Sequence, residues 1–416
     1  MVKYIMVFEK NSPVLIAVFL FPILIATVRH GGGTIYVLLL LCGLTLGWSA
    51  WRSLEAWEKR LLIGFSIFFV LVSLSLVNTQ DIVSGMKKVE RYIHFPLLVP
   101  MYLLLKKYRI ETGKVFLFGL SAASVVMFGQ AFYQTSVLGW GRAVGAYNSL
   151  ILGDVSMLAV VIIACALLTV SQNWRHHLLG FSAIGMALSA SVMSGSRGAW
   201  ILLPVAAVWF LWIKRKSLGT VSVILLVIMG LLLAWGALSL DQVKGRVDSA
   251  VSRFQDYSQD PTKVSSVGAR FEMWRDSITI WKAHPLMGTG IGDFKNDRLQ
   301  LFKDGKSNLA MDFGHAHNIY FDVLATAGLL GLVGMLVLMQ IIPFQMFYSF
   351  WIKDDDPWIK FYALSGMTTI IAFAIFGLTE GWLARNMFVR TYLMSILVFM
   401  SSIAVIKMKR LSEPHR

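Results

Sequence analysis

Hydrophobic segments close to the length of a bilayer-spanning helix recur along most of this 416-residue chain. A spanning helix needs about 20 mostly apolar residues, because its backbone polar groups can pair only within the helix. Hydrophobic residues make up 56% of the chain and charged residues 15%, which excludes a soluble enzyme. We predict an all-α polytopic membrane protein with about 12 transmembrane helices. The expected spans are residues 13–28, 34–49, 61–77, 92–105, 115–132, 150–170, 178–193, 199–213, 220–240, 319–350, 358–379 and 387–406.

Lysine and arginine predict the orientation of these spans. With the N-terminus in the cytoplasm, the breaks on that side carry basic clusters such as residues 106–109 and 214–216, and the short breaks on the other side hold fewer basic residues. Such an asymmetry is the positive-inside rule, and it places both termini in the cytoplasm. It also explains the formal net charge of +15 without a nucleic-acid partner. Cys42 and Cys165 lie inside apolar segments, so we expect no disulfide framework.

A polar insert, residues 241–317, interrupts the hydrophobic pattern between the ninth and tenth expected spans. It divides the chain into residues 1–240 with nine spans, an external loop domain, and residues 318–416 with three spans and a cytoplasmic tail. The tenth span, residues 319–350, is too long for one crossing and is expected to tilt or to continue beyond the membrane.

Two helices are predicted inside the insert. An apolar repeat of three or four residues predicts a first helix that lies on the membrane or on the spans. Its apolar positions are Val243, Val247, Val251 and Phe254. A second helix is predicted around residues 269–278 and should end near Pro285. Its apolar face consists of Phe271, Trp274, Ile278 and Trp281. The glycines that follow, Gly288, Gly290 and Gly292, suit tight turns and close approach of the backbone to a ligand.

Arginines and glycines converge on the external surface. Arg197 begins a span within the turn of residues 194–198, and Arg142 lies in a loop of residues 133–149. A guanidinium at this depth suits the phosphate oxygens of an anionic lipid head group. The alternative is an interfacial anchor that reaches ordinary phospholipid, and the residues alone leave both interpretations open.

His315 and His317 stand where the insert meets the tenth span. Their spacing of two suggests a metal pair, but the further ligands that a zinc site needs do not follow them, so we expect no metal and no cofactor. An alternative for His317 is a hydrogen-bonded residue at the start of a helix. His284 and His94 are expected to be structural.

Four motifs of the chain occur in a fixed order. They are Ser196-Arg197-Gly198, Arg270 with Trp274, Pro285-Leu286-Met287-Gly288-Thr289-Gly290 followed by Phe294, and His317-Asn318-Ile319-Tyr320 with Gly328 beyond it. In these motifs, and in its predicted spans and single large loop, the chain resembles the O-antigen ligase and O-antigen polymerase superfamily. It departs from the pattern at Ala325-Thr326-Ala327-Gly328, where relatives often carry an acidic residue just before the glycine. No role is carried over to that carboxylate.

The resemblance implies a GT-C-like glycosyltransferase of the bacterial inner membrane with a periplasmic active site. The donor would be an undecaprenyl-diphosphate-linked O-polysaccharide and the acceptor the lipid A-core oligosaccharide, with membrane lipids as further partners. A diphosphate leaving group departs more easily when cations neutralise its charge. Without an Asp-x-Asp in the insert, that role falls to Arg197 and Arg270, with Arg275 or Arg142 as further candidates.

The acceptor hydroxyl also needs a base, and a histidine near its ordinary pKa suits that task. The resemblance favours His317 as the base in a metal-independent, inverting transfer, whereas His315 would shape the turn or help to bind the acceptor. An O-antigen polymerase and a protein O-oligosaccharyltransferase of the same superfamily are alternatives. A transporter for lipid-linked sugars is the alternative from another class, but it has little need for a large external domain and should show internal repeats, which the chain lacks.

Overall fold

The computed structural model describes residues 8–171, 173–215, 252, 266–308 and 313–412, which form helices and contain no strand. The helices are α2 (Phe8–Thr27), α3 (Gly31–Leu46), η1 (Trp48–Ser53), α4 (Ala56–Leu74), η2 (Ser75–Asn78), α5 (Ile82–Tyr92), α6 (Leu98–Lys107), α7 (Gly113–Phe132), η3 (Tyr133–Val137), α8 (Ser149–Thr169), α9 (Trp174–Ser194), α10 (Arg197–Trp200), α11 (Leu202–Lys214), α14 (Ser266–Ala283), α15 (Phe294–Lys303), α16 (Ile319–Gly334), η4 (Met335–Ile341), α17 (Ile342–Lys353), α18 (Pro357–Thr379), η5 (Trp382–Ala384) and α19 (Asn386–Ser412).

Among the described residues, eight helical stretches are long and apolar enough to cross a membrane. They are Ala56–Asn78, Gly113–Val137, Ser149–Thr169, Trp174–Ser194, Arg197–Lys214, Ile319–Lys353, Pro357–Thr379 and Asn386–Ser412, and two shorter apolar helices cover Pro13–Thr27 and Gly31–Leu46. The helical multi-pass architecture is confirmed, but the count of twelve is not established. In the fourth expected span, residues 92–105, the 10-residue helix α6 begins only at Leu98 and ends at Lys107. The ninth, residues 220–240, lies outside the described residues, as do the domain boundary at 240–241 and the apolar positions of the first helix predicted in the insert.

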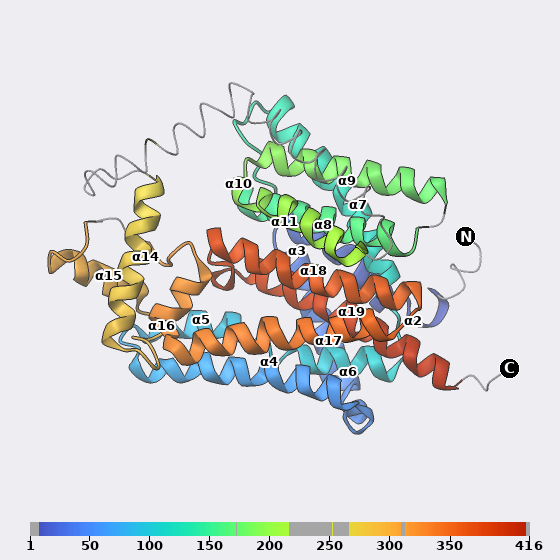
Figure 1. Ribbon diagram of the computed structural model, residues 1–416, viewed down its shortest axis with the longest axis horizontal. Helices are drawn as coiled ribbons and strands as arrows, with labels where there is room; N and C mark the ends of the chain where they lie inside the picture. Colours follow the sequence, from blue (N-terminus) through green and yellow to red (C-terminus); the bar gives the residue numbers. More distant parts are fainter. Residues whose placement is uncertain (1–7, 172, 216–251, 253–265, 309–312, 413–416) are drawn as a thin grey trace.

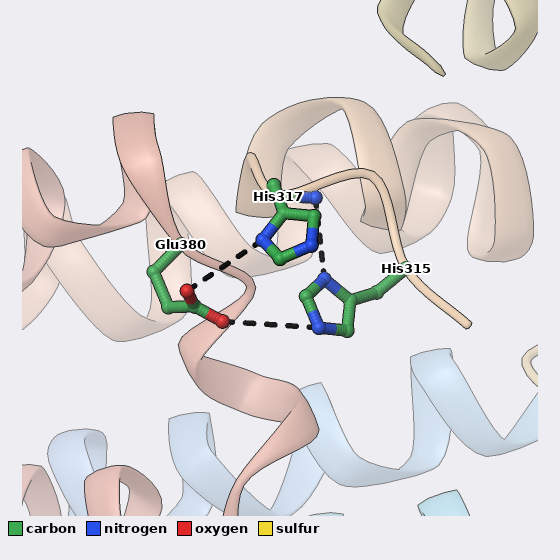
Figure 2. A group of neighbouring side chains, drawn as sticks. All are labelled: His315, His317 and Glu380. Carbon is green, nitrogen blue, oxygen red and sulfur yellow. Dashed lines mark hydrogen bonds and ion pairs between the residues drawn. The ribbon is translucent and has the colours of Figure 1, made fainter. Parts of the chain in front are cut away.

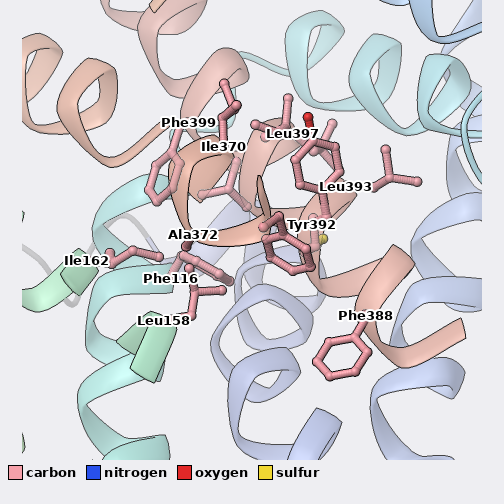
Figure 3. Packing of buried hydrophobic residues seen from close by; sticks show 14 of the residues in the cluster. Phe116, Leu158, Ile162, Ile370, Ala372, Phe388, Tyr392, Leu393, Leu397 and Phe399 are labelled. Carbon is pink, nitrogen blue, oxygen red and sulfur yellow. The ribbon is translucent and has the colours of Figure 1, made fainter. Parts of the chain in front are cut away.

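Helices α8, α18 and α19 form the centre of the bundle and are the most buried of the spans. Their apolar side chains interlock with Phe116 of α7 (Figure 3), and Leu158, Ala372 and Phe399 are among the side chains that meet there. Lipid chains are as apolar as these side chains, so close packing rather than exclusion of water holds such helices together. This rigid centre carries the loops at the ends of α8 and α18.

The tenth span is interrupted. Gly328 has φ 65° and ψ −163°, which breaks α16 into two pieces, and the π-helical turn η4 precedes Pro343 of α17. A π-helical turn and a proline both change the direction or register of a helix. The excess length of this segment is thus absorbed by a break at Gly328, where the first two turns of α16 separate from the long apolar helix.

Helices α14 and α15 lie at one end of the molecule, and α2 begins and α19 ends at the opposite end (Figure 1). The end that faces the periplasm stays a prediction. Helix α14 ends at Ala283, as expected from Pro285. Its buried face differs from the predicted one, because Ile278 is exposed while Asp276 is buried. The reason is a buried ion pair of 3.0 Å between Asp276 and Arg298 of α15, which apolar periodicity cannot reveal.

The glycine-rich segment after α14 packs on the chain itself. The backbone N–H groups of Thr289 and Gly290 donate to the carbonyl groups of Ala325 and Thr326, next to the break in α16. Gly290 has φ 128°, and a Cβ there would stand 2.4 Å from the Thr79 hydroxyl oxygen. Only glycine tolerates both conditions. The close approach expected for a ligand is therefore an approach to the chain's own backbone.

Candidate functional site

The segment that carries His315 and His317 is held at its flanks. The Asn318 side chain accepts the N–H groups of Tyr320 and Phe321, which caps α16, and its Nδ2 donates to the Leu378 carbonyl at the end of α18. His317 itself has φ 48°, a left-handed conformation that is costly for any residue except glycine. The local fold thus fixes the ring of His317 against the end of α18.

Both histidines face Glu380, which follows α18 (Figure 2). Nδ1 of His317 lies 3.6 Å from Oε2 of Glu380, and Nε2 of His315 lies 3.8 Å from Oε1. These separations are longer than hydrogen bonds. Nδ1 of His317 and Oε2 of Glu380 are buried and have no hydrogen-bond partner among the described residues. Hydrogen bonds of catalytic groups are often long in a free enzyme and shorten when substrate binds.

His315 is oriented by the backbone. Its Nδ1 accepts the backbone N–H of His317 at 3.2 Å. In a neutral imidazole one nitrogen accepts and the other carries the proton, so the proton of His315 lies on Nε2, toward Glu380. Burial, opposed by the carboxylates of Asp322 and Glu380, lowers the pKa of His315 to about 4. His315 is therefore a neutral donor at pH 7.

Glu380 is ionised although it is almost completely buried. Burial alone would raise its pKa, but the nearby His317, His315 and Arg385 bring the pKa to about 2. Arg385 supplies the permanent charge, since its Nε lies 3.3 Å from Oε1 of Glu380. One buried carboxylate therefore joins two histidines and one arginine.

The fold brings the turn that carries Arg197 close to this cluster, although the two are far apart in the sequence. Its turn rests on α8, because Ser196 donates to Asp154 at 3.0 Å and a Cβ at Gly153 would collide with Ser196. A Cβ at Gly198 would collide with Thr379, the residue before Glu380. The Arg197 side chain is exposed. The turn thus presents near the end of α18 a guanidinium that forms no ion pair with any of the described residues.

The other three arginines predicted to bind diphosphate are Arg142, Arg270 and Arg275, and each lies in a different environment. The Arg142 side chain is exposed and reaches the same turn, where its Cδ lies 4.0 Å from the position of a Cβ at Gly195. Arg270 is half-buried on α14, one turn before Trp274, whose Nε1 donates to the carbonyl of Ala316 between the two histidines.

Arg275 is not brought to the histidines by any contact that the described residues make. Its Nη2 pairs with Glu272 and contacts the Lys306 carbonyl, so its contacts serve the packing of the loop domain.

Sequence reasoning missed Glu380 and Arg385. Both stand in the short break before the last span, which the charge pattern predicts to be external, and an acidic residue in such a break was the available signal. It also judged the histidines to lack a further metal ligand. Glu380 supplies one, since His315, His317 and Glu380 each offer a ligand atom within 4.8 Å of the others. Two imidazoles and a carboxylate suit a divalent transition metal, but Arg385 already places a positive charge on that carboxylate.

Comparisons with known proteins cover much of this site. Residues 185–336 match a family model described as O-Antigen ligase. A protein of Haemophilus influenzae, described as "Uncharacterized protein", is 26% identical over 345 residues, which are 80% of this chain and 84% of that protein. The matched range includes Arg197, Arg270 and both histidines and ends before Glu380.

Proposed function

We propose, from the match of residues 185–336 to the O-antigen ligase family model, that the chain is an O-antigen ligase. It would transfer an O-polysaccharide from undecaprenyl diphosphate to a hydroxyl of the lipid A-core oligosaccharide on the periplasmic side of the inner membrane. The observation that carries this proposal is the pairing of His317 with an ionised, buried Glu380.

His317 is the proposed general base. If Nδ1 carries the proton and points to Glu380, the lone pair of Nε2 is left to accept the proton of the acceptor hydroxyl. The negative charge of Glu380 stabilises the imidazolium that forms, as the carboxylate of a catalytic triad does. Glu380 thus acts through His317 and is a positioning residue.

The bond changes are those of a single displacement. The acceptor oxygen forms a bond to the anomeric carbon while the bond from that carbon to the diphosphate oxygen breaks, so the configuration inverts. The diphosphate leaves with the electron pair, and Arg197 with Arg270 would neutralise its growing charge. No step requires a metal, because arginines take the place of the cation.

O-antigen polymerase and protein O-oligosaccharyltransferase share this chemistry and differ in the acceptor. A lipid-linked sugar transporter is disfavoured, since it needs no base beside a buried carboxylate. The test is to incubate the purified protein with lipid-linked glycan and one acceptor at a time, and to identify the conjugate that forms. A ligase joins the glycan to lipid A-core. If product forms only with a second lipid-linked glycan as acceptor, the protein is a polymerase. If no conjugate forms with any acceptor, the proposal that the protein transfers glycans is wrong.

A further inference from the structure

Arg390, at the external end of the bundle, is not part of the proposed active site and is held by a separate set of residues. Arg390 lies in the second turn of α19, and its Nε donates to Nε2 of His94 at 3.2 Å. Its guanidinium carbon lies 5.8 Å from the centre of the Tyr36 ring. A Cβ at Gly33 would stand 2.5 Å from Nη1 of Arg390, so a side chain at this position would displace the guanidinium. Helix α3, through Gly33 and Tyr36, and the connection between α5 and α6, through His94, therefore hold one guanidinium.

His94 can only accept at Nε2 if it is neutral there, which leaves the positive charge on Arg390. The Tyr36 hydroxyl donates to the backbone carbonyl of His94, so the ring that faces the guanidinium and the histidine that accepts from it are fixed together. Arg390 is held in place without being neutralised.

Arg390 forms no ion pair with a carboxylate in the part of the chain that the structure describes. Glu90 is the nearby carboxylate whose negative charge acts on it, and Glu90 is an exposed residue that makes no ion pair with it. Guanidinium offers five N–H donors, and the hydrogen bond to His94 uses one. A half-buried cation without a counter-charge is costly, and an ionisable residue within a span usually marks a binding site.

The position of Arg390 indicates the kind of anion. It follows Arg385 on the same side of the bundle, just inside the first residue of α19, where a lipid head group meets the spans. Planar guanidinium binds two phosphate oxygens at once. The His315–Glu380 cluster lies on the other side of η5 and shares no contact with Arg390 among the described residues.

We propose that Arg390, held by Gly33, Tyr36 and His94, binds a lipid phosphate group at the external membrane surface. The subsite is separate from the proposed diphosphate site. The phosphate belongs either to a lipid A-type acceptor or to a phospholipid head group. Of these two sources, only the lipid A-type acceptor rests on the proposed function.

Binding without turnover tests the subsite. Purified full-length protein in detergent is titrated with phosphorylated lipid A, dephosphorylated lipid A and phosphatidylglycerol, and each affinity is measured by native mass spectrometry. Arg390→Gln should weaken binding of phosphorylated lipid about tenfold to a hundredfold and leave dephosphorylated lipid unchanged. Gly33→Ala, which displaces the guanidinium but keeps the charge, should weaken it in the same direction. Arg29→Gln removes an exposed external arginine and is the matched control.

The outcomes are distinguishable. Loss with lipid A alone supports the subsite and assigns it to the acceptor, and equal loss with phosphatidylglycerol supports it and assigns it to head groups. If Arg390→Gln and Gly33→Ala both bind phosphorylated lipid within twofold of the wild type, the proposal is overturned. Thermal unfolding identifies a variant that does not fold, and Arg390→Lys then takes the place of Arg390→Gln with the same expected direction. Absence of transfer by the wild-type protein would count against the proposed function and not against this subsite.

Discussion

Two segments of the loop domain look alike in the sequence and differ in the structure. The segment of residues 286–292 and that of residues 314–318 both carry small or polar residues, and the second stands directly before a membrane span. In the first, the N–H groups of Gly288, Thr289 and Gly290 all bond to the chain itself. In the second, Nδ1 of His317 is buried without a partner. Satisfied polar groups stabilise a fold, whereas a buried polar atom without a partner calls for a functional explanation.

The largest expected effect is a loss of transfer activity on substitution in the segment of residues 314–318. His317→Ala should lower the rate of glycan transfer about a hundredfold to ten-thousandfold, because it removes the proposed base. The protein should still insert in the membrane and bind donor. His315→Ala is the matched variant and should cost less. Transfer by His317→Ala within about threefold of the wild type, with loss in His315→Ala, would show that His315 is the base.

Arg197→Lys tests the cation that the structure places beside the end of α18. Lysine keeps the charge but loses the two-pronged contact with phosphate, so transfer should fall about tenfold to a hundredfold. Arg270→Lys should also be poorly tolerated. Arg275→Lys provides the comparison, since Arg275 pairs with Glu272, and it should change the rate little. Equal tolerance at all three positions, measured as initial rates, would place the leaving-group site elsewhere.

Gly290→Ala tests the structural segment. The new Cβ would meet Thr79 and the positive φ would be strained, so the variant should lose about 1–3 kcal/mol of stability. Thermal unfolding in detergent measures this. Gly314→Ala in the histidine segment is the control, because a Cβ there meets nothing within 4 Å. A melting temperature of Gly290→Ala equal to that of Gly314→Ala would contradict the packing role of the glycines.

The histidine cluster should also leave a signature in the pH dependence of stability. Folding lowers the pKa of His315 from 6.5 to about 4, so its contribution is complete above pH 6.5 and is lost as the pH falls to 4. Folding lowers the pKa of Glu380 from 4.5 to about 2, and its contribution is lost between those values. Melting temperature should therefore fall steadily below pH 6.5. His315→Asn should flatten the upper part of the curve, and an unchanged curve would speak against the buried, neutral His315.

The smallest expected effect is that of a chelator. Transfer should survive an excess of chelator, because arginines serve as the cations in the proposed mechanism. The three ligand atoms around Glu380 make this a sharp test. Loss of activity that magnesium, manganese or zinc restores would convert the histidine segment into a metal site and remove His317 as the base.

Apolar periodicity was enough to predict the helical membrane architecture and the existence of α14. It failed where polar partners are distant in sequence. The buried face of α14 depends on Asp276 and Arg298, which pair across two helices, and the glycine segment depends on Thr79. Glu380 reaches the histidines only because α18 ends where α16 begins, and no local pattern encodes that meeting of helix ends. The positions of Arg197 and Arg142 near each other depend likewise on long-range packing.

Asn318 carries two tasks with one side chain. Its oxygen caps the first turn of α16, and its nitrogen donates to the last turn of α18. Aspartate could perform the first task and would repel the Leu378 carbonyl in the second. The amide of Asn318 therefore ties the residue after His317 to the end of α18, two residues before Glu380. Since the partner is a backbone carbonyl, residue 378 can change freely, whereas the asparagine at position 318 has to stay for α16 and α18 to remain joined at their ends.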